Sequence, residues 1–527
     1  MKRKALAMII ALLLSFPAFA AENSVEQSNQ LQANGAGCSS AIHQSSSNTA
    51  MVIGNGNYAN QYNDLYSNNA AHVGYVSQDI ANSIIADGEI NSGYQNNYAY
   101  AELFGELTSI TQTQSNLGTI TGTDNSMSQF NNAYAHIEEQ GRIESYAGAY
   151  AEAFANATAI GMNPHEDENY SSEYASNSST FSNYQAPFIN QQQTNSGIQQ
   201  GNNNTLSQTS HEDASIYSYS STYSGSDSNA YANAYSNGIA TDNLSSPYAL
   251  AEAYAQALAS ADALELMGPI SINQSQSNTA AQTGASNAQT QHNYANASIS
   301  SNIFANAYSE ADAYAHGNDD QVIADGNCPY CNATANASAA ASAIITLDSL
   351  RVNQDQSNNA IQSGNYSNAN QENREIGNIY SYVGANSSSD VSTNALAFSE
   401  DYIENSCPNA DAIAAADANT IADAHIAAQY IEQISSNNGL IVGDSNYLSQ
   451  SNHATDEINL YAFTDAYAST SPQAFAHGYT EGHLFPSAGA YANATGSALA
   501  GAFTHIGTNL LADYQSNDAN QMGIGNS

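Results

Sequence analysis

Long stretches of the chain alternate between small apolar residues and larger, mostly polar ones with a period of two. Between Ala249 and Leu266, alanine occupies every odd position through Ala263. Segment 229–238 alternates Tyr, Ala and Asn in the same way. Because successive side chains of a strand point to opposite faces, this alternation predicts β-strands. Alanine also favours helices, so helix stays open for the purest Ala tracts, and 410–430 is the strongest helical candidate.

A polar frame recurs along the chain and supplies its clearest internal repeat. Six complete copies and one incomplete copy start at Ile42, Ile110, Ile189, Ile272, Val352, Ile431 and Leu511. The copies share Gln, Asn, Gly and Gln at fixed offsets, and we predict that these positions form a structural ladder: Gln44, Asn48, Gly54, Gln61; Gln112, Asn116, Gly122, Gln129; Gln191, Asn195, Gly201, Gln208; Gln274, Asn278, Gly284, Gln291; Gln354, Asn358, Gly364, Gln371; Gln433, Asn437, Gly443, Gln450; Asn517, Gly523.

The recurrent glycine indicates a bend that needs positive φ or close backbone approach. Two positions before it, the frame carries either Gln, as in Gln282, or a β-branched residue, as in Ile120. A site that accepts both is typical of an inward-facing strand position. The frame is therefore interpreted as strand, Gly-centred bend, strand. The alternative is a polar linker that recurs between independent domains.

These patterns predict an all-β fold, a repetitive β-solenoid or β-helix-like stack. We expect each module of about eighty residues to hold four coils of roughly twenty residues, and about 25 coils at ~4.8 Å to form a rod on the order of 120 Å long. The alternative is a partly disordered low-complexity chain with Ala-rich helices. The expected organisation is 1–20 signal peptide, 21–41 N-terminal segment, repeats 42–109, 110–188, 189–271, 272–351, 352–430 and 431–510, and a truncated seventh repeat 511–527.

The first twenty residues have the pattern of a secretory signal peptide. Lys2, Arg3 and Lys4 precede an apolar stretch that is short for a membrane span, and Ala18-Phe19-Ala20 fits a cleavage site. We expect export, cleavage after Ala20, no transmembrane segment afterwards, and an extracellular or cell-surface location.

Composition narrows the classes of function. The chain carries 6 Lys and Arg against 48 Asp and Glu, a formal net charge of −42, and cleavage would leave only Arg142, Arg351 and Arg374 as basic residues. Nucleic acid is excluded as a natural partner because phosphate binding needs Lys and Arg. There is no Trp but there are 35 Tyr, and large aliphatic residues are sparse. Stacked aromatics and Asn/Gln ladders are expected to take the place of a conventional core.

The second half of the frame resembles the repeat of curlins, the subunits of bacterial curli amyloid fibres. The resemblance rests on Gln282-x-Gly284-x-x-Asn287 and on the equivalent segments at 199–204 and 521–526. It implies secretion across the outer membrane, solenoid coils with Gln/Asn ladders, and cross-β fibres in biofilm. This chain differs in its module of about eighty residues and in the shorter spacing from Asn287 to Gln291.

Candidate chemistry is sparse. We assign no catalytic residues, no metal site and no cofactor. Cys328 and Cys331 have the spacing of a local disulfide, while Cys38 and Cys407 cannot be paired from the sequence. The acidic clusters at 165–168 and 211–213 each contain a His, but a solvated loop between strands is the favoured interpretation.

The sequence therefore predicts a secreted structural protein, a subunit of an extracellular amyloid-like fibre or biofilm matrix, and not an enzyme. Its partners would be further copies of itself, with a secretion or nucleator protein as a possible addition. The alternative is a monomeric rod-shaped surface adhesin that binds carbohydrate or protein.

Overall fold

The computed structural model describes residues 18–19, 24–104, 107–161, 165–184, 187–240, 248–320, 330–401, 408–480 and 488–526. Within them the protein is all-β and its strands pair in parallel. The strands are β1 (Ala18–Phe19), β2 (Ser24–Ile53), β3 (Tyr58–Asp87), β4 (Ser92–Phe104), β5 (Leu107–Thr121), β6 (Ser126–Gly161), β7 (His165–Tyr184), β8 (Phe188–Gln200), β9 (Thr205–Ala240), β10 (Tyr248–Met267), β11 (Ile270–Thr283), β12 (Ala288–Asp320), β13 (Tyr330–Leu347), β14 (Leu350–Ser363), β15 (Asn368–Asp401), β16 (Asn409–Ile426), β17 (Tyr430–Val442), β18 (Tyr447–Thr480), β19 (Gly489–Ile506) and β20 (Leu510–Met522).

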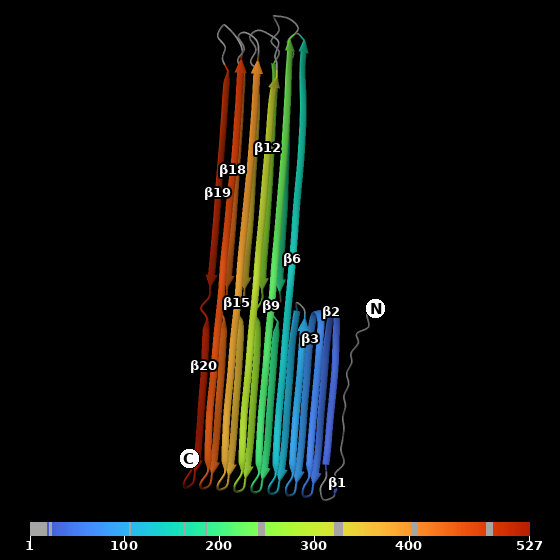
Figure 1. Ribbon diagram of the computed structural model, residues 1–527, viewed down its shortest axis with the longest axis vertical. Helices are drawn as coiled ribbons and strands as arrows, with labels where there is room; N and C mark the ends of the chain where they lie inside the picture. Colours follow the sequence, from blue (N-terminus) through green and yellow to red (C-terminus); the bar gives the residue numbers. More distant parts are fainter. Residues whose placement is uncertain are drawn as a thin grey trace.

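The chain winds through eight stacked coils (Figure 1). In each coil it runs outward along one sheet, returns along a facing sheet and ends in a Gly-centred bend. Equivalent residues lie 34 positions apart between the first coils and 79 to 83 positions apart between the later ones. Three short coils are thus followed by five long ones. Coils 1 to 8 span 24–57, 58–91, 92–125, 126–204, 205–287, 288–367, 368–446 and 447–526.

The observed coil length corrects the expectation that each module holds four coils of roughly twenty residues. A module of about eighty residues is one coil and not four, because Ile189 pairs with Ile272 and Ile272 with Val352. The alternating Tyr/Ala tracts continue through β9, which is 36 residues long, without a bend. At about 3.3 Å per residue such a strand spans about 120 Å. The long axis of the molecule therefore follows the strands, and the eight layers stack across it (Figure 1).

The strands form three parallel sheets. One outward sheet contains β6, β9, β12, β15 and β18, and continues through β4 and the first halves of β3 and β2. The return path is divided by short breaks into a five-stranded sheet, β7-β10-β13-β16-β19, and a second sheet nearer the bends that ends at β20. Because coils 1 to 3 are short, the molecule has a stepped outline on its N-terminal side (Figure 1).

The Ala-rich tracts are strands, so the helical alternative is wrong for them. The helical candidate 410–430 forms β16, and the tract 249–266 lies in β10. Alternate residues of β16 are buried, and Ala supplies nearly all of them. Tertiary pairing with flanking strands overrides the intrinsic helix preference of alanine. The described residues include no helix with the length and apolar character needed to cross a bilayer.

Each Gly-centred bend uses two residues with positive φ. The first is the glycine of the frame, such as Gly284 at φ 127°, and the third is in the left-handed region, such as Ser286 at φ 60°. A Cβ on Gly284 would lie 1.9 Å from the carbonyl oxygen of Gly201 in the neighbouring coil. Glycine is therefore required both by conformation and by the close approach of stacked backbones.

The core changes character along the strands. Nearest the bends, buried Asn and Gln lie beside a small apolar cluster that includes Ile120. A zone of branched aliphatic residues such as Ile299 follows, and farther out the core is lined by Ala such as Ala335. The frame position two residues before the glycine points inward as expected, because both Gln282 and Ile120 are buried. Small Ala side chains let the two facing sheets pack closely along most of the half of the molecule that is farther from the bends, the upper half in Figure 1.

Candidate assembly site: amide ladders and the open last coil

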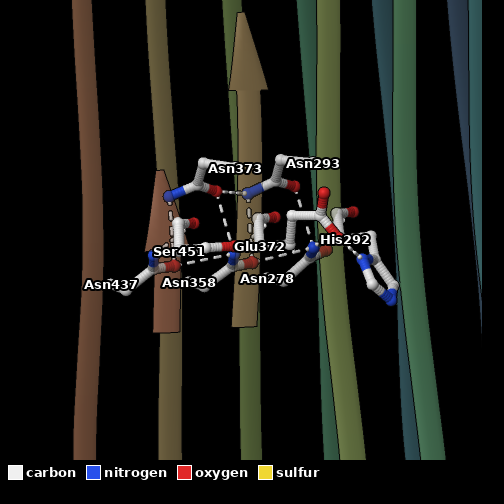
Figure 2. A network of polar contacts seen from close by, with 8 residues as sticks. All are labelled: Asn278, His292, Asn293, Asn358, Glu372, Asn373, Asn437 and Ser451. Carbon is white, nitrogen blue, oxygen red and sulfur yellow. Dashed lines mark hydrogen bonds and ion pairs between the residues drawn. The ribbon is translucent and has the colours of Figure 1, made fainter. Parts of the chain in front are cut away.

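A zigzag of side-chain hydrogen bonds, made mostly by Asn amides, crosses the core, and Figure 2 shows the part of it from Asn278 to Asn437. Asn278 Nδ2 donates to Asn293 Oδ1 at 2.8 Å, and Asn293 Nδ2 donates to Asn358 Oδ1 at 3.1 Å. Asn358 continues to Asn373 at 2.8 Å, and Asn373 continues to Asn437 at 3.1 Å. One step passes from the return sheet of a coil to the outward sheet of the next coil. The following step passes back to the return sheet within that same coil. The donors consistently point toward the C-terminal end.

The zigzag extends from the first coil to the last. Asn29 donates to Asn48, and Asn452 donates to Asn517. In coil 5 the outward member is Ser210, whose hydroxyl accepts from Asn195 and donates to Asn278. A buried amide left without partners would cost about 1–3 kcal/mol, so continuity of the zigzag fixes the register of the coils.

Glutamine ladders run parallel to the zigzag with the opposite polarity, and the two longest follow the first and last Gln of the frames. Gln274 Nε2 donates to Gln191 Oε1 at 2.9 Å, and Gln354 Nε2 donates to Gln274 Oε1 at 2.8 Å. In the outward sheet Gln371 donates to Gln291 at 2.9 Å. Most of these Nε2 atoms also donate to a backbone carbonyl of the facing sheet, as Gln354 does to Ile376.

The residues predicted from the frames fall into four columns of the stack. The first column holds Gln44, Gln112, Gln191, Gln274, Gln354 and Gln433. The second holds Asn48, Asn116, Asn195, Asn278, Asn358, Asn437 and Asn517. The third holds Gln61, Gln129, Gln208, Gln291, Gln371 and Gln450. The fourth is the bend column of Gly54, Gly122, Gly201, Gly284, Gly364, Gly443 and Gly523.

The sequence analysis missed coil 2 and the outward half of the zigzag. Gln78, Asn82 and Gly88 complete the columns inside the 68-residue interval between the first two frames. The sequence held one signal for coil 2, because the 68-residue interval between the first two frames is twice the 34-residue length of a short coil. The outward Asn residues lie two positions after the third-column Gln, as Asn373 follows Gln371.

Aromatic side chains form columns on the outer faces. Tyr66, Tyr98 and Tyr134 follow one another with ring centroids 5.4 and 5.6 Å apart. The column continues through His211 to Tyr294, whose rings stack at 4.7 Å. Burial, followed by the charges of neighbouring groups, raises the pKa of Tyr98 to about 12. Tyrosine rings therefore follow one another on the solvent side of the sheets, but the two Tyr–Tyr pairs of this column are tilted by 41° and not stacked as expected.

Several carboxyl groups lie inside the stack. Glu212 and Glu375 occupy one column of the outward sheet, separated by Ala295. Burial raises the pKa of Glu212 well above its usual value and that of Glu375 to about 8. Burial likewise raises the pKa of Glu265 to about 7, although its carboxylate accepts a hydrogen bond from Ser220. Burial therefore favours the protonated, neutral forms of Glu212 and Glu375 in the folded protein.

The cysteine and histidine candidates are only partly described. Cys331 is buried in β13, whereas Cys328 and Cys407 lie outside the described residues. Nothing is described of the side chains of Cys38 or of cluster 165–168. Cluster 211–213 lies within β9 and not in a loop, and its three side chains alternate between the two faces of the sheet. That alternation separates Glu212 from His211 and keeps the cluster from converging on one ion.

Coil 8 is an open layer. Among the described residues, β18, β19 and β20 each pair on one edge only, with β15, β16 and β17. Leu511 continues the column of Ile431, yet its exposed fraction is 52%, whereas that of Ile431 is 0%. An unpaired edge beside exposed apolar side chains is a template for another strand.

Coil 1 forms the opposite end. Its β2 pairs with β3 on one edge, and on the other edge only with β1, at Val52 and Ile53. Coil 1 carries the same inward positions as the later coils, including Gln27, Asn29 and Gln44. The two ends therefore present matching ladder residues.

Comparison of the chain with protein-family models, with curated proteins and with solved structures returned no match.

Proposed function

We propose that this protein is a secreted subunit of an extracellular amyloid-like fibre or biofilm matrix, and that coil 1 of one copy adds onto coil 8 of another. The observation that carries the proposal is the open layer of coil 8, which offers the ladder positions that coil 1 also holds. The likeness of the frames to curlin repeats supports the same assignment, as does the signal-peptide pattern at 1–20. A secretion or nucleator protein would act by presenting an equivalent layer.

The ladders of two copies would continue across the junction with their existing polarity. Inside the chain, Gln61 donates to Gln27 and Asn116 donates to Asn131. At the junction, Gln27 of the added copy would donate to Gln450, and Asn517 would donate to Asn29 of the added copy. The amides would then also select the register of the added layer.

The stepped outline defines how much of coil 8 is covered. Coil 1 matches only the part of coil 8 near the bends, because it is a short coil. The upper part, formed by β19 and the second half of β18, would face a slot three layers deep, about 14 Å. Eight layers at about 4.8 Å give an axial repeat of about 38 Å per subunit. Averaged electron micrographs of fibres should show this repeat.

A pair of matched substitutions tests the proposal. Leu511→Asp places a charge in the layer that would be covered, where an unpaired carboxylate is costly. Leu499→Asp places the same charge in the upper part of coil 8, where Leu499 is 65% exposed and the proposed junction leaves it uncovered. Both sites are exposed in the single copy, so both variants should fold.

The measurement is seeded fibre elongation of the purified processed chain, followed by thioflavin fluorescence and light scattering. We expect concentration-dependent growth for the unmodified chain and for Leu499→Asp, and at least tenfold slower growth for Leu511→Asp. A chain that stays monomeric at all concentrations would support the adhesin alternative instead. Equal growth of the two variants would reject the proposed junction.

A further inference from the structure

Two histidines and an aspartate converge on the outer face of the upper return sheet, close to the open end. His425 of β16 lies directly opposite His505 of β19 in the register of the two strands. Their rings stack with centroids 4.5 Å apart. Asp423 lies two residues before His425 and therefore on the same face of the strand.

The carboxylate of Asp423 lies between the two imidazoles. Its Oδ2 is 3.1 Å from His425 Nε2, and its Oδ1 is 4.0 Å from His505 Nε2. One ligand atom from each of the three residues lies within 4.8 Å of the others. Oδ1 is buried and has no hydrogen-bond partner among the described residues. The Asp423 carboxylate thus places Oδ2 beside one imidazole nitrogen and the uncompensated Oδ1 4.0 Å from the other, and this arrangement has the chemistry of a ligand set that awaits a cation.

The surroundings leave room for an ion and its remaining ligands. The two histidines line an open hollow of about 820 Å³ at the break between the upper and lower return strands, and Asp348 lines the same hollow. In the earlier coils, the column that contains the two histidines holds Asn183, Leu266 and Thr346. Within the described part of the chain, the complete set of three ligands therefore occurs only where coils 7 and 8 meet.

We propose that Asp423, His425 and His505 bind a divalent first-row transition metal ion such as Zn²⁺. Imidazole nitrogen and carboxylate oxygen suit Zn²⁺ and Cu²⁺, with bond lengths near 2.0–2.2 Å. The exposed imidazole rings turn about their side-chain torsions so that both Nε2 lone pairs meet at one point, with Asp423 as the third ligand. Water from the hollow completes the coordination. The net charge of −42 raises the local concentration of cations around the protein.

This site links the last two coils and does not depend on fibre formation. Its test uses the full processed chain as a monomer, kept below any concentration at which it assembles. Zn²⁺ is titrated calorimetrically into the unmodified chain and into the variants His505→Ala and Asp423→Asn. His292→Ala is the matched control, because His292 contacts Glu372 at 3.2 Å and is likewise partly exposed, but does not belong to the three-residue set.

We expect one Zn²⁺ per chain, at least tenfold weaker binding in both site variants, and unchanged binding in the control. As a second readout, Cu²⁺ bound to the unmodified chain should show paramagnetic-resonance couplings to two imidazole nitrogens, reduced to one in His505→Ala. No binding, or binding that neither site variant weakens, would overturn the proposal. Circular dichroism of each variant verifies that the β-structure is retained.

Discussion

Asn358 donates a hydrogen bond across the core to Asn373 at 2.8 Å, although the two residues belong to successive coils. Asn358 also donates to Asn437 at 3.0 Å in its own sheet and accepts from Asn278 at 3.1 Å. One side chain thus connects the two facing sheets and three neighbouring layers (Figure 2). The zigzag of such residues is a buried hydrogen-bond network that fixes the register in which the coils stack.

Removing one member of the zigzag should destabilise the stack. Asn358→Ala would remove a hydrogen-bond partner from four neighbouring buried amides, and we expect a loss of at least about 2 kcal/mol. Asn438→Ala is the control, because Asn438 is exposed on the outer face and should change stability by less than about 0.5 kcal/mol. Denaturant unfolding of the monomer measures both. Similar effects for the two variants would contradict the role of the zigzag.

The Gly-centred bends should not tolerate a side chain. In Gly284→Ala the added methyl would meet the carbonyl of Gly201, and the residue would be held at φ 127°. We expect a loss of more than about 1 kcal/mol. Gly148→Ala serves as the reference, because a Cβ there meets only Tyr146 at 3.6 Å, an ordinary contact. Thermal midpoints of the two variants should separate clearly, and equal midpoints would argue against the close backbone approach.

The buried carboxyl groups should make stability depend on pH. The pKa of Glu375 is about 8 in the folded protein because of burial, against 4.5 for an unperturbed Glu. At Glu375 the folded state therefore binds more protons than the unfolded state between these values, so the contribution of this residue to stability is greatest below pH 4.5 and falls as the pH rises toward 8.

Glu375→Gln should remove part of this dependence. We expect it to gain at least about 1.4 kcal/mol at pH 8 relative to the unmodified chain, the equivalent of one pKa unit. Glu432→Gln, at an exposed position, should follow the unmodified curve. Unfolding free energies measured from pH 4 to pH 8 check this, and identical slopes for all three proteins would be the contrary result.

Fibre growth should accelerate as the pH falls. Asp456 lies in the open layer, and burial, followed by the charge of Asp513, raises its pKa to about 6. Covering Asp456 favours its protonated form, so docking takes up a proton at this residue and strengthens below about pH 6. Asp456→Asn should elongate faster than the unmodified chain at pH 7 and respond less to acid. Elongation rates at pH 5 and pH 7 measure the effect. Equal pH responses of the variant and the unmodified chain would exclude Asp456 as the group that slows docking at neutral pH.

Much of the fold could be predicted from the sequence because one geometric rule, in-register parallel pairing of alternating strands, governs most of it. Alternation indicated strands, and equal spacing of Gln and Gly indicated a stack, since in-register parallel pairing places like residues over one another. The size of the coil was not accessible in the same way. Nothing in the tract from Gln208 to Ala240 announces that it runs without a bend, and the partial match at twenty-residue intervals suggested bends that do not exist.

The metal ligands and buried acids were hidden for a related reason. His425 and His505 are adjacent only because the coil is eighty residues long, so a coil of twenty residues offered no reason to pair them. Glu212 is buried because it shares a strand face with Ala214, and a local acidic cluster such as 211–213 does not reveal that face without the register of the sheet.

The register of whole coils is tested most directly by engineered cysteine pairs. Asn273 and Asn353 lie opposite each other on the outer face of β11 and β14, with their amides 2.8 Å apart. Strand neighbours about 4.8 Å apart fall within the range that a disulfide bridges. Mild oxidation of the double variant Asn273→Cys/Asn353→Cys should give an intramolecular disulfide in peptide maps, while Asn273→Cys/Ser357→Cys, four residues out of register, should not. A disulfide in the second pair and none in the first would contradict the one-coil module on which the account rests.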